Sequence, residues 1–187
     1  CEGELLQLHH RDDWALGERT YFEIIRRKTA SLCGVCCRMP AVLVTGEVDG
    51  GGGAIAHTLF GFGEKLGVAF QIVDDVLDLT GNAEEVGKTL GRDLAKGKLT
   101  LPLLRHLATV DSVERDALVA DLEHGADDDA IFRLREAIRA GDGLDYARQW
   151  AQRLVGDAKQ AIEEQLPPTA ARQLLLDMAD AVLSRKF

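Results

Sequence analysis

The sequence contains few aromatic residues, few prolines and no long hydrophobic segment. Phe, Trp and Tyr make up 5% of the 187 residues, and four residues are Pro, whereas Leu and Ala are abundant. Leu and Ala are strong helix formers, so this composition favours helices. No apolar run reaches the roughly 18 residues that a membrane-spanning helix needs, and no signal peptide is recognisable. We therefore expect an all-α protein in the cytoplasm, without a transmembrane segment.

The sequence also lacks an excess of basic residues. It has 22 Lys and Arg against 31 Asp and Glu, which gives a net charge of −9. Nucleic-acid binding depends on basic side chains that neutralise phosphates, so we expect no nucleic-acid partner. An anionic substrate would need cationic side chains gathered at one place. The length allows one domain with a substantial core, and we predict a single domain over residues 1–187.

Cysteine is the next scarce residue, and three of the four cysteines form the pattern CxxCC. They are Cys33, Cys36 and Cys37, with Cys1 apart from them. A zinc site needs a second ligand pair, and the five histidines offer no obvious one. We interpret the three as small core residues on a helix in a reducing cytoplasm. A metal- or redox-binding helical module built on CxxCC is the alternative, and stoichiometric zinc would support it.

Three carboxylates stand near the end of the longest helical pattern, which we place at residues 54–80. Asp74, Asp75 and Asp78 fall on one side of this helix, with Gln71 beside them. Carboxylates that converge on a partly buried face repel one another and lose solvation. A divalent cation relieves both effects, and hard oxygen ligands favour Mg²⁺. The pattern therefore predicts a magnesium site.

A segment rich in glycine and lysine follows this helix and contains Lys88, Arg92, Lys96 and Lys98. Its glycines allow the backbone and the lysines to close over an anion. Acidic and basic side chains this close in sequence predict a metal-bridged anion, for which a diphosphate is the best candidate.

FQIVDDVLD followed by GKTLGRDLAKGKLTLPLL resembles the second aspartate-rich motif of the trans-isoprenyl (polyprenyl) diphosphate synthases. Terpene cyclases share aspartate-rich metal sites but not the segment that follows, so the match is specific. The resemblance covers essentially all 187 residues and corresponds to the later part of the family's chain. The sequence looks most like the medium- and long-chain, octaprenyl-type synthases. The resemblance implies an isoprenoid-synthase-type helical bundle, here without its N-terminal helices, and a homodimer.

The resemblance also implies a prenyltransferase that joins an allylic diphosphate to isopentenyl diphosphate with Mg²⁺ as cofactor. It assigns the catalytic roles to Lys28, Thr29 and Gln71, the diphosphate to Lys28, Lys88 and Lys98, the metal to Asp74, Asp75 and Asp78, and support of the loop to Asp93. Among the metal-binding residues, Asp74 and Asp75 hold magnesium and Asp78 supports them.

A second helix is expected to begin near Thr20 and to carry the KTA segment that contains Lys28 and Thr29. Its apolar stripe consists of Tyr21, Ile24, Ile25, Leu32 and Val35. On composition alone, Lys28 ends a charged run of the kind that is usually solvated. The KTA match before the aspartate motif favours the binding role instead.

Three features of the family are not found in these 187 residues: the first aspartate-rich motif, the arginine pair beside it and the earlier site for isopentenyl diphosphate. We therefore expect a truncated synthase that is inactive by itself. The alternative is a non-catalytic or regulatory subunit of a heteromeric prenyl synthase.

Overall fold

The computed structural model describes residues 2–45, 53–81, 91–123 and 127–185. Every regular element in these ranges is a helix, which confirms the all-α prediction. The elements are α1 (Glu2–His9), α2 (Glu18–Ile25), the π-helical segment η1 (Arg26–Ala30), α3 (Ser31–Thr45), α4 (Gly53–Thr80), α6 (Arg92–Ala95), α7 (Leu101–Thr109), α8 (Ser112–Glu123), α9 (Asp128–Ala140), α10 (Gly143–Gln165) and α11 (Ala170–Leu183). None of the described helices is both long and apolar enough to cross a membrane.

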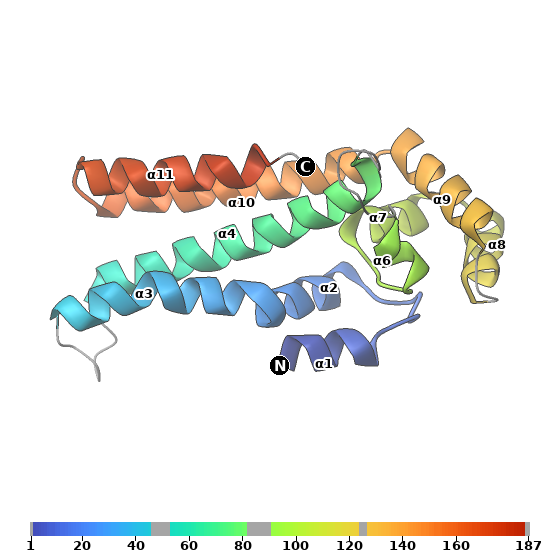
Figure 1. Cartoon of the computed structure of the whole chain (residues 1–187), viewed down its shortest axis with the longest axis horizontal. Helices are drawn as coiled ribbons and strands as arrows, with labels where there is room; N and C mark the ends of the chain where they lie inside the picture. Colours follow the sequence, from blue (N-terminus) through green and yellow to red (C-terminus); the bar gives the residue numbers. More distant parts are fainter. Residues whose placement is uncertain (1, 46–52, 82–90, 124–126, 186–187) are drawn as a thin grey trace.

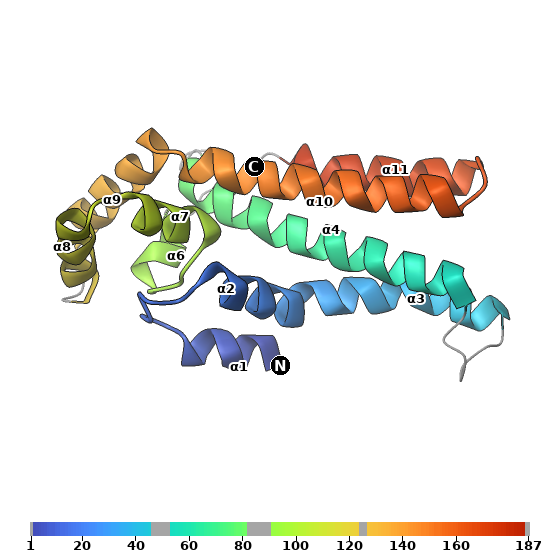
Figure 2. The same cartoon turned by 180° about the vertical axis from the view of Figure 1, so that it is seen from behind.

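Helix α4 lies at the centre of an elongated bundle (Figures 1 and 2). Helix α3 packs along one side of α4 and α10 along the other, while α11 contacts both α10 and α4. Helix α1 lies against η1, and helices α6 to α9 gather where α4 ends. Because α4 has neighbours on several sides, its apolar residues are spread around the helix, and Phe62, Ile72 and Leu79 are fully buried. The helix predicted at residues 54–80 is confirmed.

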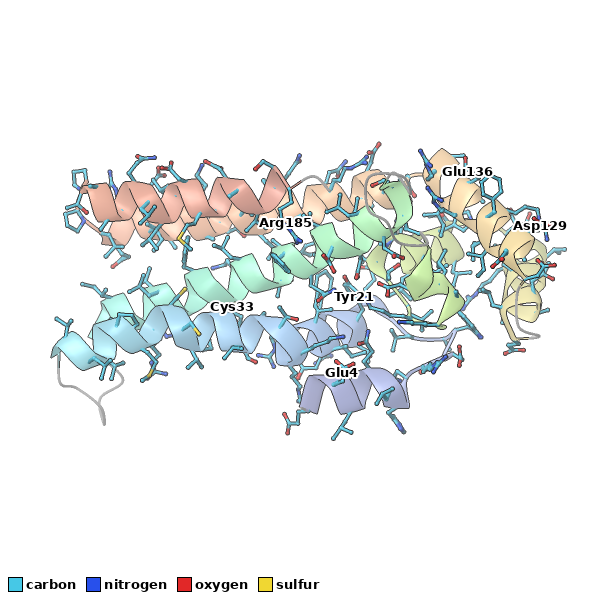
Figure 3. All side chains as sticks on the ribbon, in the orientation of Figure 1. Glu4, Tyr21, Cys33, Asp129, Glu136 and Arg185 are labelled. Atoms are coloured by element: carbon cyan, nitrogen blue, oxygen red, sulfur yellow. The ribbon has the colours of Figure 1, made fainter. Side chains whose placement is uncertain are left out.

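Two glycines of α4 allow η1 and α3 to approach closely. A Cβ atom on Gly63 would lie 2.4 Å from the carbonyl oxygen of Cys33, and one on Gly67 would lie 2.6 Å from the Cα of Ala30. Both distances are far below van der Waals contact, so neither position has room for a side chain. The backbones of α3 and α4 therefore pack against each other directly, with Cys33 on the side of α3 that faces α4 (Figure 3).

The second helix contains a π-helical turn at η1 that the sequence analysis did not predict. Before it, Tyr21, Ile24 and Ile25 are buried as expected, but after it Leu32 and Val35 are exposed. A π turn inserts one extra residue and rotates everything that follows by about 100°. The predicted stripe is therefore wrong beyond Ile25, and Ala30, Cys33 and Cys37 pack toward α4 in its place.

Candidate functional site

The carboxylate of Asp75 is the centre of a buried polar network. Its side chain is completely inaccessible to solvent and accepts three hydrogen bonds. The donors are the Tyr21 hydroxyl at 2.8 Å, the Gln71 amide at 3.1 Å and the Lys98 ammonium at 3.0 Å. These donors come from α2, from α4 itself and from the segment after α6, so Asp75 connects three parts of the chain.

The network continues from Gln71 to the KTA segment. The hydroxyl of Thr29 donates to Oε1 of Gln71 at 3.3 Å. Thr29 lies in η1, so the π turn sets the direction in which this residue and Lys28 face. Such turns occur often at functional sites because they re-aim side chains without ending the helix. Three residues that the resemblance assigns, Thr29, Gln71 and Asp75, are therefore linked in the folded chain.

On the other side of Asp75, Lys98 is held by a second carboxylate. Its ammonium lies 2.6 Å from Oδ2 of Asp93, and its backbone N–H donates to the carbonyl of Asp93 at 2.9 Å. The backbone N–H of Asp93 in turn donates to Oδ2 of Asp78 at 3.2 Å. Gly97 permits this tight return because its φ is +65°. The segment 93–98 is thus fastened to α4 at both Asp75 and Asp78.

Burial and charge act against each other in this network. Burial raises the pKa of Asp75, and the ammonium of Lys98 and the Tyr21 hydroxyl oppose that rise. Burial alone would lower the pKa of Lys98, but the negative charges of Asp75 and Asp93 raise it above its usual value. The pKa of Tyr21 is raised by burial and by the charge of Asp75. We conclude that Lys98 stays charged and that Tyr21 keeps the proton with which it donates to Asp75.

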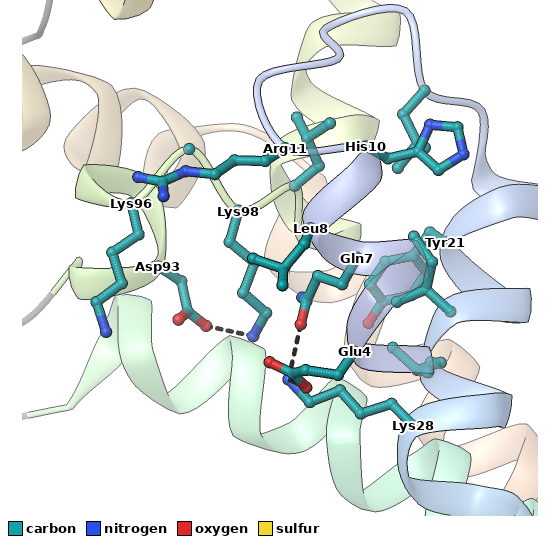
Figure 4. Close-up of a pocket in the computed structure, with 15 residues that line it drawn as sticks. Glu4, Gln7, Leu8, His10, Arg11, Tyr21, Lys28, Asp93, Lys96 and Lys98 are labelled. Atoms are coloured by element: carbon teal, nitrogen blue, oxygen red, sulfur yellow. Dashed lines mark hydrogen bonds and ion pairs between the residues drawn. The ribbon is translucent and has the colours of Figure 1, made fainter. Parts of the chain in front are cut away.

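Lys28 borders a cavity of about 230 Å³ between α1, η1 and the segment 96–99 (Figure 4). Its ammonium donates to Oε1 of Gln7 at 2.7 Å and lies 3.0 Å from a carboxylate oxygen of Glu4. The side chain of Lys28 is 28% exposed, so it is not the fully solvated lysine that a charged run alone predicts. The cavity is also lined by Arg11, Lys96 and Lys98. Basic side chains thus gather at one place in a chain whose net charge is −9.

The three aspartates of the motif have different surroundings. Asp75 is buried with Lys98, Asp78 is half-buried against Asp93, and Asp74 lies 3.4 Å from Arg185 with 44% of its side chain exposed. Among the described residues, no three His, Cys, Asp or Glu side chains form a group that could hold a metal ion by themselves. The predicted convergence of all three carboxylates on one ion therefore stays a prediction. Lys88 lies outside the described residues.

The sequence profile of the polyprenyl synthetase family matches residues 1–139. The chain belongs to this family. Octaprenyl diphosphate synthase of Haemophilus influenzae is 36% identical over the whole chain, and heptaprenyl diphosphate synthase component 2 of Geobacillus stearothermophilus is 34% identical. The whole chain also superposes with a TM-score of 0.88 on polyprenyl synthase from Caulobacter crescentus CB15, complexed with calcium and isoprenyl diphosphate, at 34% identity.

This polyprenyl synthetase chain spans about half the length of the relatives it matches. It covers 55% of the Haemophilus protein, 56% of the Geobacillus protein and 55% of the Caulobacter chain. The helical architecture is therefore shared with solved polyprenyl synthases over the whole of the present chain.

Several residues of this polyprenyl synthetase site were missed by the sequence analysis. Tyr21 was assigned only to an apolar stripe, although a buried Tyr hydroxyl usually has a hydrogen-bond partner and could have indicated one. Glu4 and Gln7 carried no signal for a contact with Lys28. Arg185 lies 111 residues from Asp74 in sequence, so no local pattern could have joined them.

The CxxCC cysteines lie on α3, as predicted, but not all are core residues. Cys33 and Cys37 are partly buried, whereas Cys36 is exposed. Burial raises the pKa of both Cys33 and Cys37, which disfavours the thiolate that metal binding and redox chemistry require. The metal- or redox-module alternative thus has no support from the described residues.

Proposed function

We propose that this chain forms the diphosphate-activating part of an all-trans polyprenyl diphosphate synthase. The proposed reaction joins an allylic diphosphate to isopentenyl diphosphate. The observation that carries the proposal is the network described above: Lys98, Asp75, Gln71 and Thr29 form one connected path in the core beside Lys28. A buried charged network of this kind is costly unless it is fully bonded, and it positions its members rigidly.

The chemistry of the proposed reaction explains why such rigidity matters. Loss of diphosphate leaves an allylic carbocation, so negative charge develops on the leaving oxygens while positive charge develops on carbon. Fixed cations stabilise the negative charge on the leaving oxygens, which is the first role. Fixed oxygen dipoles stabilise the positive charge on carbon, which is the second role. We assign the first role to Lys28, together with Lys88 and Lys98, and the second to the oxygens of Thr29 and Gln71.

Lys28 and Lys98 have different parts in this assignment. Lys98 is anchored by two carboxylates, so its position is set before any substrate binds. Lys28 is held by Gln7 and the exposed carboxylate of Glu4, and it can exchange these partners for a phosphate oxygen. Lys98 therefore organises the site and Lys28 binds the incoming anion.

The relatives' family depends on a divalent metal, and we propose magnesium for this chain. Its residues fit such an ion in part: Asp74 and Asp78 are four residues apart on α4 and keep some exposure, so their oxygens can reach the ion directly or through water. Asp75 already has three donors, and we now favour a role for it in fixing Lys98 over direct ligation. When bound, magnesium would neutralise charge on the leaving diphosphate.

A second candidate function is that of a subunit in a heteromeric prenyl synthase. The observation that favours it is the Geobacillus relative, which is called component 2 of a heptaprenyl diphosphate synthase. Elongation that appears only when a second, different chain is added would support this candidate over the first.

The proposed function is tested by measuring the affinity of the 187-residue chain for an allylic diphosphate, with and without Mg²⁺. Calorimetry gives this affinity. We expect magnesium-dependent binding that Lys28→Ala weakens by about ten- to a hundredfold, because a hydrogen bond to a charged group is lost. Lys159→Ala is the control, since Lys159 pairs with Asp180 on the far side of the bundle. Binding that is unaffected by Lys28→Ala would contradict the assignment.

The same chain should be assayed for elongation with labelled isopentenyl diphosphate. The chain spans about half the length of its relatives, and we propose that it supplies only part of the electrostatic groups that surround the diphosphate. Removing one set of electrostatic donors typically costs about 10²–10³ in rate. We therefore expect no measurable elongation from the 187-residue chain alone. Elongation at an ordinary rate would refute this expectation.

We also propose that the chain forms a homodimer through α3. Four apolar side chains on one face of this helix are exposed: Leu32, Val35, Met39 and Leu43. Arg38 is the only charged residue of α3, and an exposed apolar stripe of this kind is typical of an interface. Light scattering after gel filtration should give a dimer, and Met39→Glu should convert it to a monomer. A wild-type monomer at high concentration would contradict the proposal.

We place the protein in the cytoplasm. The described cysteines are free thiols, which fits a reducing compartment.

A further inference from the structure

Arg185 lies just after the end of α11 and reaches back to α4 (Figure 3). Its Nη2 atom donates to Oδ1 of Asp74 over 3.4 Å. Its guanidinium also lies over the ring of Phe70, 3.9 Å from the ring centroid. Phe70 and Asp74 are four residues apart on α4 and therefore share one face of the helix. The arginine thus covers the first aspartate of the motif by contacting two neighbours on that face.

The two contacts differ in kind. A donor–acceptor distance of 3.4 Å is longer than that of a strong hydrogen bond, and the two side chains keep 27% and 44% exposure. An ion pair that is this long and only partly buried contributes little. The stack on Phe70, with 3.9 Å between the guanidinium carbon and the ring centroid, lies well inside the range of a cation–π contact and gives Arg185 a resting place that does not depend on the carboxylate. The arginine is therefore held near Asp74 by a contact that can persist or break independently of the ion pair.

Movement of Arg185 away from Asp74 would leave the buried residues of α11 in place. Helix α11 ends at Leu183, and its buried residues are Leu176 and Ala179, which lie one turn or more before the end. The arginine also borders a cavity of about 240 Å³ between α4, α10 and α11, so there is room beside its present position. Arg185 can therefore leave Asp74 without unpacking α11.

We infer that Arg185 is an internal counter-ion that occupies Asp74 in the metal-free chain and that a divalent cation must displace. This inference rests on the proposed role of Asp74 in holding magnesium. A divalent cation at Oδ1 of Asp74 and the guanidinium of Arg185 repel each other at this distance, so binding of one opposes binding of the other. Metal binding is then coupled to release of the end of α11 from α4.

The test uses Mn²⁺, which prefers the same oxygen ligands as Mg²⁺ and whose free concentration can be read from its electron paramagnetic resonance. Arg185→Gln should tighten Mn²⁺ binding by about three- to tenfold, because a partly buried ion pair and a cation–π contact no longer compete with the metal. Phe70→Leu should act in the same direction but less strongly, since it removes the stack and keeps the charge. Arg148→Gln is the matched control: Arg148 borders the same cavity but pairs with Asp145.

A second readout follows the end of α11 directly. Amide hydrogen exchange over residues 181–184 should speed up when the wild-type chain is saturated with Mn²⁺, and this increase should be lost in Asp74→Asn. A purely structural role for Arg185 would leave exchange there independent of the metal.

The outcomes separate this inference from the proposed function. Equal Mn²⁺ affinity in the wild type and Arg185→Gln, or an equal gain in Arg148→Gln, would overturn the inference and leave the metal site standing. Weaker binding in Arg185→Gln would also overturn it, because the arginine would then assist the metal. If neither the wild type nor Arg185→Gln binds Mn²⁺ at millimolar concentration, the magnesium site of the proposed function fails and the inference fails with it.

Discussion

Lys98 and Asp75 form an ion pair with 3.0 Å between Nζ and Oδ1, at a place where the Asp75 side chain is completely buried. Removing one member of such a pair leaves an unpaired charge in the protein interior, which is far more costly than removing both. Asp93 gives Lys98 a second carboxylate at 2.6 Å, but Asp75 has no second cation among the described residues. Loss of Lys98 would therefore leave the buried charge of Asp75 without a cation, whereas loss of Asp75 would leave Lys98 paired with Asp93.

Lys98→Met is expected to lower the free energy of unfolding by about 3–5 kcal/mol, because it leaves Asp75 buried and unpaired. The double variant Lys98→Met with Asp75→Asn should recover much of that loss, since no buried charge remains. Urea denaturation measures both values. Lys96→Met is the control, because Lys96 is exposed on the same segment. A loss below about 1 kcal/mol in Lys98→Met would show that Asp75 does not depend on this lysine.

Gly63→Ala and Gly61→Ala should change stability in opposite directions. The new methyl group at residue 63 would meet the Cys33 carbonyl oxygen at 2.4 Å, so α3 and α4 must separate, at a cost of about 1–3 kcal/mol. At residue 61 a methyl group would meet no atom within 4 Å beyond the adjoining backbone of its own helix, and alanine should stabilise the helix by up to about 1 kcal/mol. Thermal unfolding of the two variants gives the comparison. Similar midpoints for both would contradict the close packing of the two helices.

The three cysteines of α3 should differ in reactivity toward a thiol reagent at pH 8. Cys36 is exposed, whereas burial raises the pKa of Cys33 and Cys37 and keeps their thiols protonated. Only the thiolate reacts, so Cys36 should be labelled first. The measurement uses a Cys1→Ser background to remove the fourth thiol, with Cys36→Ser as the control that should abolish the fast phase. A fast phase that survives in Cys36→Ser would disprove the prediction.

Stability should fall as the pH drops below about 6.5, and His106 should account for part of that loss. His106 is buried on α7, and burial lowers its pKa in the folded chain. The unfolded chain therefore binds a proton that the folded chain does not. Unfolding is favoured as the pH falls through the pKa that His106 has in the unfolded chain. Melting temperatures between pH 7.5 and 5.5 should depend less on pH in His106→Gln than in the wild type. His57→Gln, at an exposed position of α4, should follow the wild type.

Local sequence patterns were sufficient for the all-α class and for the central helix. The helix predicted at residues 54–80 is observed at Gly53–Thr80, because its apolar spacing and the Thr-Gly-Asn end are local signals. Asp127 caps α9 by accepting a hydrogen bond from the Ala130 N–H, and an acidic residue directly before a helix is a local signal of the same kind. The aspartate motif and the KTA segment were also recognisable from residue types and spacing alone.

Tertiary structure decided how those residues are used. Asp74, Asp75 and Asp78 are equivalent in the sequence, but only Asp75 faces Tyr21 and Lys98 in the core, and only Asp74 meets Arg185. The π turn at η1 likewise has no signal in the helical periodicity, because one inserted residue is stabilised by the packing of Ala30 against α4 rather than by local preference. A carboxylate's type and spacing are local properties, whereas its burial, its partners and therefore its charge state depend on chain segments that only folding brings together.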